Sequence, residues 1–394
     1  MDNKKINVGI DATTWSNDRG FGRFTRELII ALANRESEFN YTLVFDQPPT
    51  IAVPDNINTV VATTNESLNE AAVGDSSRSP GYLWKMGQLV RKEKFDIFYY
   101  PAVYSYFPML AKVPCVVCYH DATAERFPEY LFPKKINKIL WDVKTWLAKL
   151  QTTRAMTISQ SSANDLENIL HIPKRKIDLV TEGADNKFHV INDPEAASKV
   201  REKYKIAADA EVLLALGGMN AHKNIFGVLK AMPEIIKQVP KVQLVIIGDT
   251  SGKGFWDNVP ELMAFVKDHP PLSEHVIFTG YASDEDVVKL FASTAALVFP
   301  SLWEGFGLPA VEAMQCGVPV LASNRGSLPE VVGNAGLLFD PLNVDEISAT
   351  IIRFFTETGL RQKLTDASLP QSRLFSWERG AEMAEECFRK CLKK

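Results

Sequence analysis

Short apolar runs alternate with amphipathic segments along almost the whole chain. In the first half, the strand-like runs INVGID, YTLVFD, FDIFYYP and VPCVVCYHD are interleaved with helical patterns such as FTRELIIALAN. In the second half, the runs EVLLALGG, VQLVIIGD, HVIFTGY, AALVFPS and VPVLAS repeat the same alternation. Strands that alternate with helices indicate βαβ units and a parallel sheet. Two such series predict an α/β protein with two Rossmann-like domains.

The stretch TEGADNKFHVINDPEAASKV separates the two series, because it is polar and lacks long apolar runs. We therefore predict an N-terminal domain over residues 1–188 and a C-terminal domain over residues 189–375. The final segment, residues 376–394, has the pattern of an amphipathic helix. Residues 50–80 are rich in Asn, Ser, Thr and Gly and show little periodicity, which predicts a loop-rich insertion.

Composition narrows the function classes. A chain of 394 residues with 46% hydrophobic content has enough apolar side chains for two cores. Its formal net charge of −4 argues against a general nucleic-acid binder. The sequence lacks both a run of eighteen apolar residues and the long apolar stretch of a signal peptide, so we expect a cytoplasmic protein. Five cysteines fit a reducing compartment, and we interpret Cys115 and Cys118 as core thiols in a buried strand.

Residues 295–323 carry the most informative pattern, AALVFPSLWEGFGLPAVEAMQCGVPVLAS. An apolar run ends at Pro300 and is followed by a glycine-punctuated loop. Pro309 stands where a helix would take its first turn, and Gly317 closes that helix before a second apolar run. The pattern predicts a strand, a loop, a helix and a second strand.

Two carboxylates and several free amides belong to this unit. Glu304 lies in the predicted loop and Glu312 close to the predicted helix start, so both fall at the carboxyl end of a strand, where open α/β sheets bind ligands. The backbone amides of Phe306, Gly307 and Leu308 stand at a helix N-terminus, which favours an anion such as phosphate. The carboxylates have the chemistry to accept hydrogen bonds from sugar hydroxyls.

Glu304 and Glu312, with Gly-Phe-Gly-Leu-Pro between them, resemble the donor-sugar signature of glycosyltransferase family 4. The resemblance implies a retaining enzyme of the GT-B fold, in which two Rossmann-like domains face each other across a cleft. It implies transfer of a hexose of the glucose or mannose type from a UDP- or GDP-linked donor to a glycan or lipid-linked acceptor. Glu304 would position the sugar and Glu312 would hold the nucleotide ribose, and neither a metal nor another cofactor is expected. In this fold the final helix crosses back to the N-terminal domain.

A second phosphate element is predicted in LALGGMNAHKN, where a strand ends and Lys223 precedes the next helix. A lysine at such a loop tip has the charge to neutralise a diphosphate. Relatives in the resembled family commonly carry an arginine five residues before this lysine, but Gly218 occupies that position here. Two interpretations stay open: a protonated His222 replaces the missing cation, or the phosphates depend more on backbone amides.

The N-terminal half offers two further candidates. The loop after the first strand contains Gly22, but Thr25 stands where the dinucleotide-binding fingerprint needs Gly or Ala, so a dehydrogenase loses its main support. The resemblance instead implies that the backbone at Gly22 approaches the donor phosphates. His120 follows the run VPCVVCY at a strand's carboxyl end, where family relatives face the sugar with a histidine that donates a hydrogen bond or moves a proton.

The segment PKKINKILWDVKTWLAKLQTTR, residues 133–154, is basic and amphipathic. One interpretation is a helix whose apolar face packs on the core, and the other is a helix that lies on an anionic membrane surface, peripheral to the inner membrane. The predicted apolar face contains Ile136, Ile139, Leu140, Val143, Leu147 and Leu150.

Two other functions fit the same residues. A nucleotide-sugar epimerase of the same fold would release free nucleotide and an epimerised sugar without any acceptor. A non-catalytic subunit would bind the ligand and partner an active transferase. The intact pair of glutamates and Lys223 favour an active enzyme, while Gly218 leaves the binding subunit open.

Overall fold

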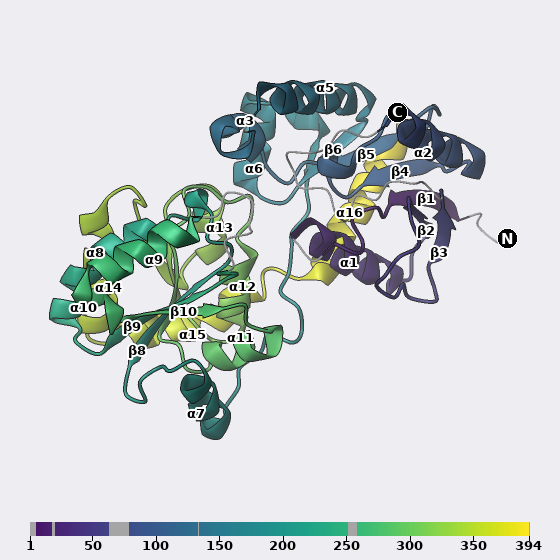
Figure 1. Ribbon diagram of the computed structural model, residues 1–394. Coiled ribbons are helices and arrows are strands. Elements are labelled where there is room, and N and C mark those ends of the chain that lie inside the picture. The colour runs from purple at the N-terminus through teal and green to yellow at the C-terminus, as the bar shows by residue number, and fades with distance from the viewer. Residues whose placement is uncertain (1–4, 18–19, 63–78, 133, 251–257, 394) are drawn as a thin grey trace. The chain divides into compact units, whose positions relative to one another are not determined.

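The computed structural model describes residues 5–17, 20–62, 79–132, 134–250 and 258–393. Contacts divide the chain into two compact units, Met1–Glu182 with Ser376–Lys394, and Gly183–Phe375. Each unit is built on its own parallel sheet, which confirms the predicted α/β class with two Rossmann-like domains. Figure 1 shows the elements of both units.

The boundary lies slightly earlier in the chain than the predicted division at residues 188 and 189. The difference has a local cause. Glu182 still packs against the first unit, with its carboxylate 3.9 Å from the imidazole of His120. Asp185 and Lys187 already belong to the second unit, since Gln315 donates to the carbonyl of Asp185 and Lys187 pairs with Asp284.

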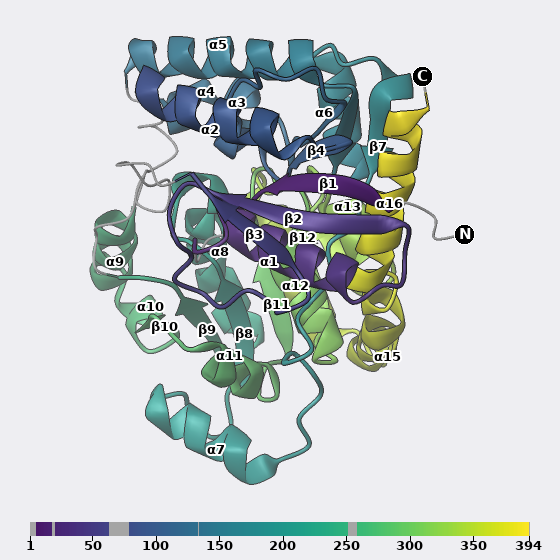
Figure 2. The same cartoon turned by 90° about the vertical axis from the view of Figure 1, so that its right-hand side faces the viewer.

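The first unit contains a sheet with the strand order β3-β2-β1-β4-β5-β6-β7 in the described part of the chain. Its strands are β1 (Ile6–Asp11), β2 (Phe39–Phe45), β3 (Asn58–Val61), β4 (Ile97–Tyr100), β5 (Cys115–Cys118), β6 (Arg154–Thr157) and β7 (Ile177–Leu179). Its helices are α1 (Gly20–Ala33), α2 (Pro80–Glu93), α3 (Thr123–Arg126), α4 (Pro128–Leu131), α5 (Lys135–Gln151), α6 (Gln160–Asn168) and α16 (Trp377–Leu392). Figure 2 shows α2 and α5 on one face of this sheet and α1 on the other.

One prediction for the first unit is refined and one needs correction. Within the predicted loop-rich insertion of residues 50–80, Asn58–Val61 form the edge strand β3 beside β2; residues 63–78 of that prediction lie outside the described residues. Gly22 is not in a loop, since helix α1 begins at Gly20. A Cβ at residue 22 would come within 1.9 Å of the carbonyl oxygen of Asn17, so this glycine allows the preceding backbone to approach the first turn.

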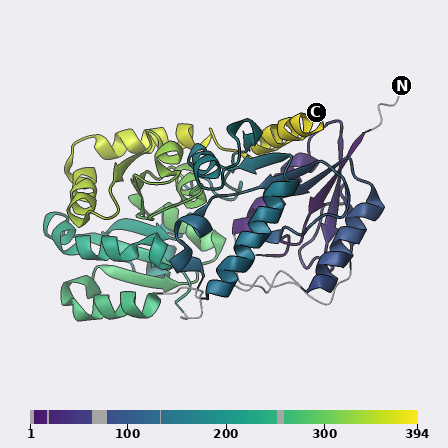
Figure 3. The same cartoon turned by 90° about the horizontal axis from the view of Figure 1, so that it is seen from above.

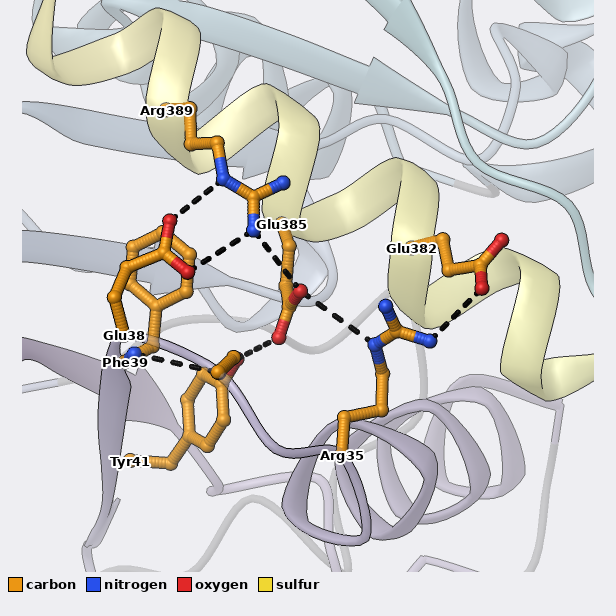
Figure 4. Close-up of polar contacts among 8 residues, drawn as sticks. Arg35, Glu38, Phe39, Tyr41, Glu382, Glu385 and Arg389 are labelled. Atoms are coloured by element: carbon orange, nitrogen blue, oxygen red, sulfur yellow. Dashed lines mark hydrogen bonds and ion pairs between the residues drawn. The ribbon is translucent and has the colours of Figure 1, made fainter.

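Helix α16 packs on the first unit through charged contacts (Figure 4). The buried carboxylate of Glu385 accepts a hydrogen bond from the hydroxyl of Tyr41 on β2 at 3.1 Å. Arg389 donates to Glu38 at 2.6 Å, and this guanidinium lowers the pKa of the Glu38 carboxyl. Arg35, just after α1, pairs with Glu382 at 3.0 Å. The last helix of the chain is thus part of the N-terminal unit.

The second unit contains a parallel sheet with the order β10-β9-β8-β11-β12-β13 in the described residues. Its strands are β8 (Glu211–Leu216), β9 (Val242–Ile247), β10 (Val276–Gly280), β11 (Ala296–Phe299), β12 (Val320–Ser323) and β13 (Gly336–Phe339). Its helices are α7 (Pro194–Lys203), α8 (Ile225–Gln238), α9 (Val259–Asp268), α10 (Pro270–Ser273), α11 (Asp284–Phe291), α12 (Leu308–Gln315), α13 (Leu328–Val332), α14 (Val344–Thr356) and α15 (Leu360–Ser372).

The order of strands in the second unit locates its ligand edge. The chain proceeds from β8 outward to β10 and then returns to place β11 on the other side of β8. This reversal is a topological switch point, and doubly wound sheets bind ligands at the carboxyl ends of the strands that flank it. The loops that follow β8 and β11 are the two that carry Lys223 and Glu304.

Candidate functional site

The loop between β11 and α12 matches its prediction in detail. Strand β11 ends at Phe299, and α12 begins at Leu308 with Pro309 in its first turn. Gly307 precedes the helix with φ = 99°, a left-handed conformation that favours glycine, and a Cβ there would lie 2.7 Å from the side chain of Leu328. Gly317 follows the helix with φ = 76°.

Two residues that the sequence analysis missed hold this loop in place. The hydroxyl of Ser327 donates to the carbonyl of Phe306 at 2.6 Å, and its oxygen lies 3.1 Å from the carbonyl oxygen of Glu304. Gly326, with φ = 62°, lets the backbone pass so close to Glu304 that a Cβ would lie 2.7 Å from the Glu304 carbonyl oxygen. The dipeptide Gly326-Ser327 after β12 was the available signal, since such pairs mark turns.

The backbone amides of this loop are available for a ligand. Within the described residues, the N–H groups of Phe306, Gly307 and Leu308 donate to no protein acceptor. Phe306 is buried, and its ring packs edge-on against Phe375 at 5.5 Å. The loop backbone is therefore fixed while its N–H groups stand at the positive end of α12, which is a favourable position for an anion.

Lys223 and Glu304 come together from loops that are 81 residues apart. The ammonium of Lys223 donates to the Glu304 carboxylate at 2.7 Å and lies 5.6 Å from the ring centroid of Phe299. Burial raises the pKa of Glu304, but the neighbouring ammonium outweighs it and the net shift is downward, so the carboxylate is ionised at neutral pH. The structure thus places a cation, a carboxylate and a helix N-terminus together at the switch point.

Asn224 fixes the loop that carries Lys223. Lys223 ends a short 3-10 turn, Ala221–Lys223, and Asn224 follows in the left-handed conformation with φ = 53° before α8 begins. The Asn224 amide donates to the carbonyls of Pro300 and Pro341 at 3.2 and 2.7 Å. This side chain ties the loop after β8 to the loop after β11.

His222 does not supply the missing cation. Burial, followed by the positive charge of Lys223, lowers the pKa of His222 to about 4. The imidazole is therefore neutral at neutral pH. Of the two interpretations left open by the sequence, the one based on a protonated His222 is disfavoured in this structure.

Gly218 lines the same small pocket as Lys223, at the carboxyl ends of β8 and β11. A Cβ at residue 218 would meet only the side chain of Asn220, at an ordinary distance of 3.5 Å. We expect Gly218→Arg to fold normally and to tighten binding of a nucleoside diphosphate by about fivefold, because it adds a second cation near Lys223. Titration calorimetry of both proteins at two salt concentrations measures this.

Gly218→Ala is the matched control for that substitution, since it adds the Cβ without the charge. Its affinity should equal that of the wild type. A gain in affinity for the alanine variant, or a loss for the arginine variant, would show that the diphosphate does not lie beside residue 218.

Glu312 lies deeper than the other candidates. It is on the second turn of α12 and only 3% exposed. Burial, followed by the negative charge of Glu312, raises the pKa of Cys316 to about 12, so the carboxylate lies near that thiol. Glu312 follows the available amides of residues 306–308 in the sequence and lies on the helix that begins at Leu308.

His120 and Gly22 belong to the first unit, so the structure does not place them against the residues above. His120 follows β5, and its ring contacts Phe21 and Phe24 of α1 edge-on, with centroids 5.0 and 4.5 Å apart. These two phenylalanines flank Gly22 in the sequence. The first unit therefore has its own candidate cluster at the carboxyl ends of β1 and β5.

The hydrogen bonds of His120 limit its chemistry. Its Nε2 lies 2.9 Å from the carbonyl oxygen of Pro101, which only accepts, so Nε2 carries the proton. Burial lowers the pKa of His120 to about 4. What remains for a ligand is the Nδ1 lone pair, on the side of Glu182. A hydrogen bond donated from His120 to a sugar, one of the roles expected from the sequence, would require loss of the bond to Pro101.

The predicted core thiols are confirmed: Cys115 and Cys118 are buried and free, and burial raises the pKa of both. Among the residues that the structure describes, there is no group of three His, Cys, Asp or Glu side chains arranged to hold a metal ion. No helix in the same described part is both long enough and apolar enough to span a membrane.

Comparison with known proteins identifies the family. The family model "Glycosyltransferase Family 4" matches residues 19–188, and the model "Glycosyl transferases group 1" matches residues 197–369. The O-antigen chain mannosyltransferase B of Escherichia coli is 33% identical over 264 residues, which are 67% of this chain and 67% of that protein. The chain belongs to glycosyltransferase family 4. It is a glycosyltransferase enzyme.

Other relatives of this family 4 chain differ in length. The serotype-specific mannosyltransferase WbdA of Escherichia coli is 29% identical over 248 residues, so the match covers 62% of this chain but only 30% of WbdA. Among solved structures, Anabaena Alr3699/HepE in complex with UDP-glucose is similar with a TM-score of 0.72 and 19% identity, covering 98% of this chain and all of that one. This likeness confirms the GT-B fold.

Proposed function

We propose that this family 4 enzyme transfers a hexose, of the glucose or mannose type, from a UDP- or GDP-linked donor to an acceptor hydroxyl with retention of anomeric configuration. The observation that carries the proposal is the pair of Lys223 and Glu304, 2.7 Å apart beside the available amides at the start of α12. A nucleotide sugar has an anionic diphosphate and a hydroxylated ring, and this arrangement offers a partner to each.

Each residue has a role in this proposal. Lys223 and the amides of residues 306–308 bind the diphosphate and stabilise the negative charge that develops as it leaves. Glu304 accepts hydrogen bonds from the sugar, and Glu312 accepts them from the ribose. In the first unit, the N-terminal backbone of α1 at Gly22 approaches the phosphates. The Nδ1 atom of His120 accepts a hydrogen bond from a sugar hydroxyl. The acceptor attacks from the face that the diphosphate leaves.

One related structure supports the class of donor, and one relative in sequence supports the type of sugar and the role in polysaccharide biosynthesis. A solved structure of the same fold binds UDP-glucose, which supports a nucleotide-sugar donor. The relative with 33% identity is an O-antigen chain mannosyltransferase, which supports a hexose of the mannose type and a role in polysaccharide biosynthesis with a glycan acceptor. The match covers two thirds of that relative and under a third of WbdA. We therefore propose a glycan acceptor for this chain on the basis of these partial matches.

The test is turnover by the purified chain with UDP-glucose and GDP-mannose, each with a panel of glycan acceptors. We expect one donor to give a glycoside whose anomeric configuration equals that of the donor. Free nucleotide and an epimerised sugar without acceptor would instead identify an epimerase. Tight donor binding without turnover on any acceptor would identify a binding subunit.

The same assay tests metal dependence. Because Lys223, the loop amides and the end of α12 are proposed to balance the diphosphate charge, transfer should persist at an unchanged rate in excess chelator. The control is the same reaction after dialysis with magnesium or manganese added back. Loss of transfer in chelator that either ion restores would overturn this part of the proposal.

A further inference from the structure

Helix α5 packs on the rest of the first unit through a face that carries few large apolar side chains. The side chains of Trp141, Thr145 and Ala148 are buried on the sheet side, while Lys144 donates to the carbonyl of Tyr104 at 2.9 Å and Lys149 to that of Leu170 at 3.1 Å. These contacts are separated by three or four residues, so they follow one stripe of the helix. Of the two interpretations that the sequence left open, the one in which the apolar face of this helix packs on the core is disfavoured, because Ile136, Ile139, Leu140, Val143 and Leu150 of that face are exposed.

The broad apolar face of α5 is turned to solvent instead. Six of its large apolar side chains are between 44% and 65% exposed, and they recur at helical spacing: Ile136, Ile139, Leu140, Val143, Trp146 and Leu150. We call these six residues the outer stripe. In Figure 3 the helix lies in front, with no described helix or strand drawn over it. Monomeric proteins rarely expose a contiguous apolar stripe of this kind, and where they do it marks an interaction site.

Two other segments on this face of the sheet also expose apolar side chains. Helix α2 covers the same face of the sheet as α5 and exposes 60% of Trp84. The loop between them is tied to α5 by two hydrogen bonds between Gln151 and the backbone of Met109, and it exposes Leu110 beside Gly87 of α2.

The segments that expose these apolar side chains are rich in basic residues. Residues 80–151 contain eleven lysines and arginines against six acidic residues, in a chain whose net charge is −4. Lys134 and Lys135 are exposed at the start of α5, and Lys85, Arg91 and Lys92 are exposed on α2. Asp142 is the one acidic residue of α5, and it pairs with Lys138. The charge near the outer stripe is thus predominantly positive.

We propose that the outer stripe docks the enzyme on an anionic lipid surface. An amphipathic helix with large apolar side chains on one face and lysines beside it lies in the interface plane, with the apolar side chains among the acyl chains and the ammonium groups at the headgroups. Trp146 and Trp84 suit this boundary because the indole is apolar with one polar N–H. The inference concerns a surface of the first unit and is independent of the donor and acceptor proposed above.

Charge decides against a second copy of the chain as the occupant. If two outer stripes packed together, each copy would bring the same excess of basic over acidic residues to the interface. The acid available on α5 is already paired, so the like charges would remain close without compensation. An anionic lipid surface compensates the same charges.

The test is flotation of the full-length chain with vesicles of phosphatidylcholine alone or with 30% phosphatidylglycerol. We expect binding to the anionic vesicles that falls as salt increases, and much weaker binding to the neutral ones. The double variant Ile139→Glu/Val143→Glu should reduce the anionic partition coefficient about tenfold or more, because it places two carboxylates in the acyl region. Lys134→Gln/Lys135→Gln should reduce it by a smaller factor and weaken its salt dependence.

Matched controls lie in the second unit. Met263→Glu/Leu342→Glu changes two exposed apolar residues to carboxylates, and Lys230→Gln/Lys267→Gln removes two exposed lysines. Both controls should bind anionic vesicles as the wild type does, and all variants should bind nucleotide equally. The proposal is overturned if the wild type does not bind anionic vesicles, if the controls lose binding to the same extent, or if sedimentation shows a dimer that Ile139→Glu/Val143→Glu dissociates.

Discussion

Glu312→Ala is expected to weaken donor binding and transfer by about 2–4 kcal/mol in total, with the fold intact. The reason is the position of the carboxylate, which is only 3% exposed on the second turn of α12. Hydrogen bonds from ribose hydroxyls to a buried charge are stronger than those made in water. The measurements are kcat/KM for transfer and the dissociation constant of the nucleoside diphosphate.

A ligand with altered ribose separates this role from a structural one. If Glu312 binds the ribose, a 2′,3′-dideoxy nucleoside diphosphate should bind the wild type more weakly, but should bind wild type and Glu312→Ala about equally. Glu261→Ala, at an exposed position on α9, is the control and should change neither quantity. Wild-type turnover in Glu312→Ala, or an equal loss of affinity for both nucleotides, would remove Glu312 from the ribose site.

The elements that the sequence predicted well are those with strong local signals. The strand, loop and helix around α12 were correct because Pro309 and Gly317 mark the two ends of the helix and both apolar runs are buried strands. The same signals located Glu304 and the available amides. Sequence alone did not show that the Glu304 carboxylate pairs with Lys223, because that contact depends on how β8 and β11 pair in the sheet.

One error and one question that the sequence left open show the limits of local patterns. Gly20 and Gly22 predicted a loop because glycine disfavours helix, yet α1 begins at Gly20, since the close approach of the Asn17 carbonyl requires a residue without a side chain. The stripe of Ile136, Ile139 and Val143 was correctly identified as one face of a helix, but periodicity does not say which face meets the core. The residues of α5 that are buried against the unit are instead Trp141, Thr145 and Ala148. Only the packing of the whole unit shows which face is buried.

Supporting residues were the least visible part of the site. Ser327, Asn224 and Glu182 shape the loops or the surroundings of candidate residues, but each is a common polar residue at a long distance in the sequence from the group it contacts. Charge states were equally hidden. The lowered pKa of His222 depends on burial and on Lys223 nearby, and it removed an interpretation that the sequence had left open.

Lys223→Ala is expected to lower kcat/KM, with a loss of about 1.5–3 kcal/mol of transition-state stabilisation. The loss expected for His222→Ala is much smaller. Lys223 supplies an ammonium at the proposed diphosphate, whereas the His222 imidazole is neutral at neutral pH because burial and Lys223 lower its pKa to about 4. Lys223→Arg should be only partly active, because the planar guanidinium places its donors differently from the compact ammonium. Steady-state kinetics with the donor identified by the turnover assay checks all three.

The contact between Lys223 and Glu304 makes a double-mutant cycle necessary. Removing the ammonium leaves the Glu304 carboxylate, whose side chain is 14% exposed, without its partner at 2.7 Å, so part of the loss could come from Glu304 alone. Lys223→Ala in a Glu304→Gln background isolates the phosphate contribution. We expect it still to weaken nucleoside diphosphate binding at least about fivefold, while binding of the nucleoside changes little. If the cycle shows no further loss, Lys223 serves only to hold Glu304, and the backbone amides at the start of α12 bind the diphosphate without it.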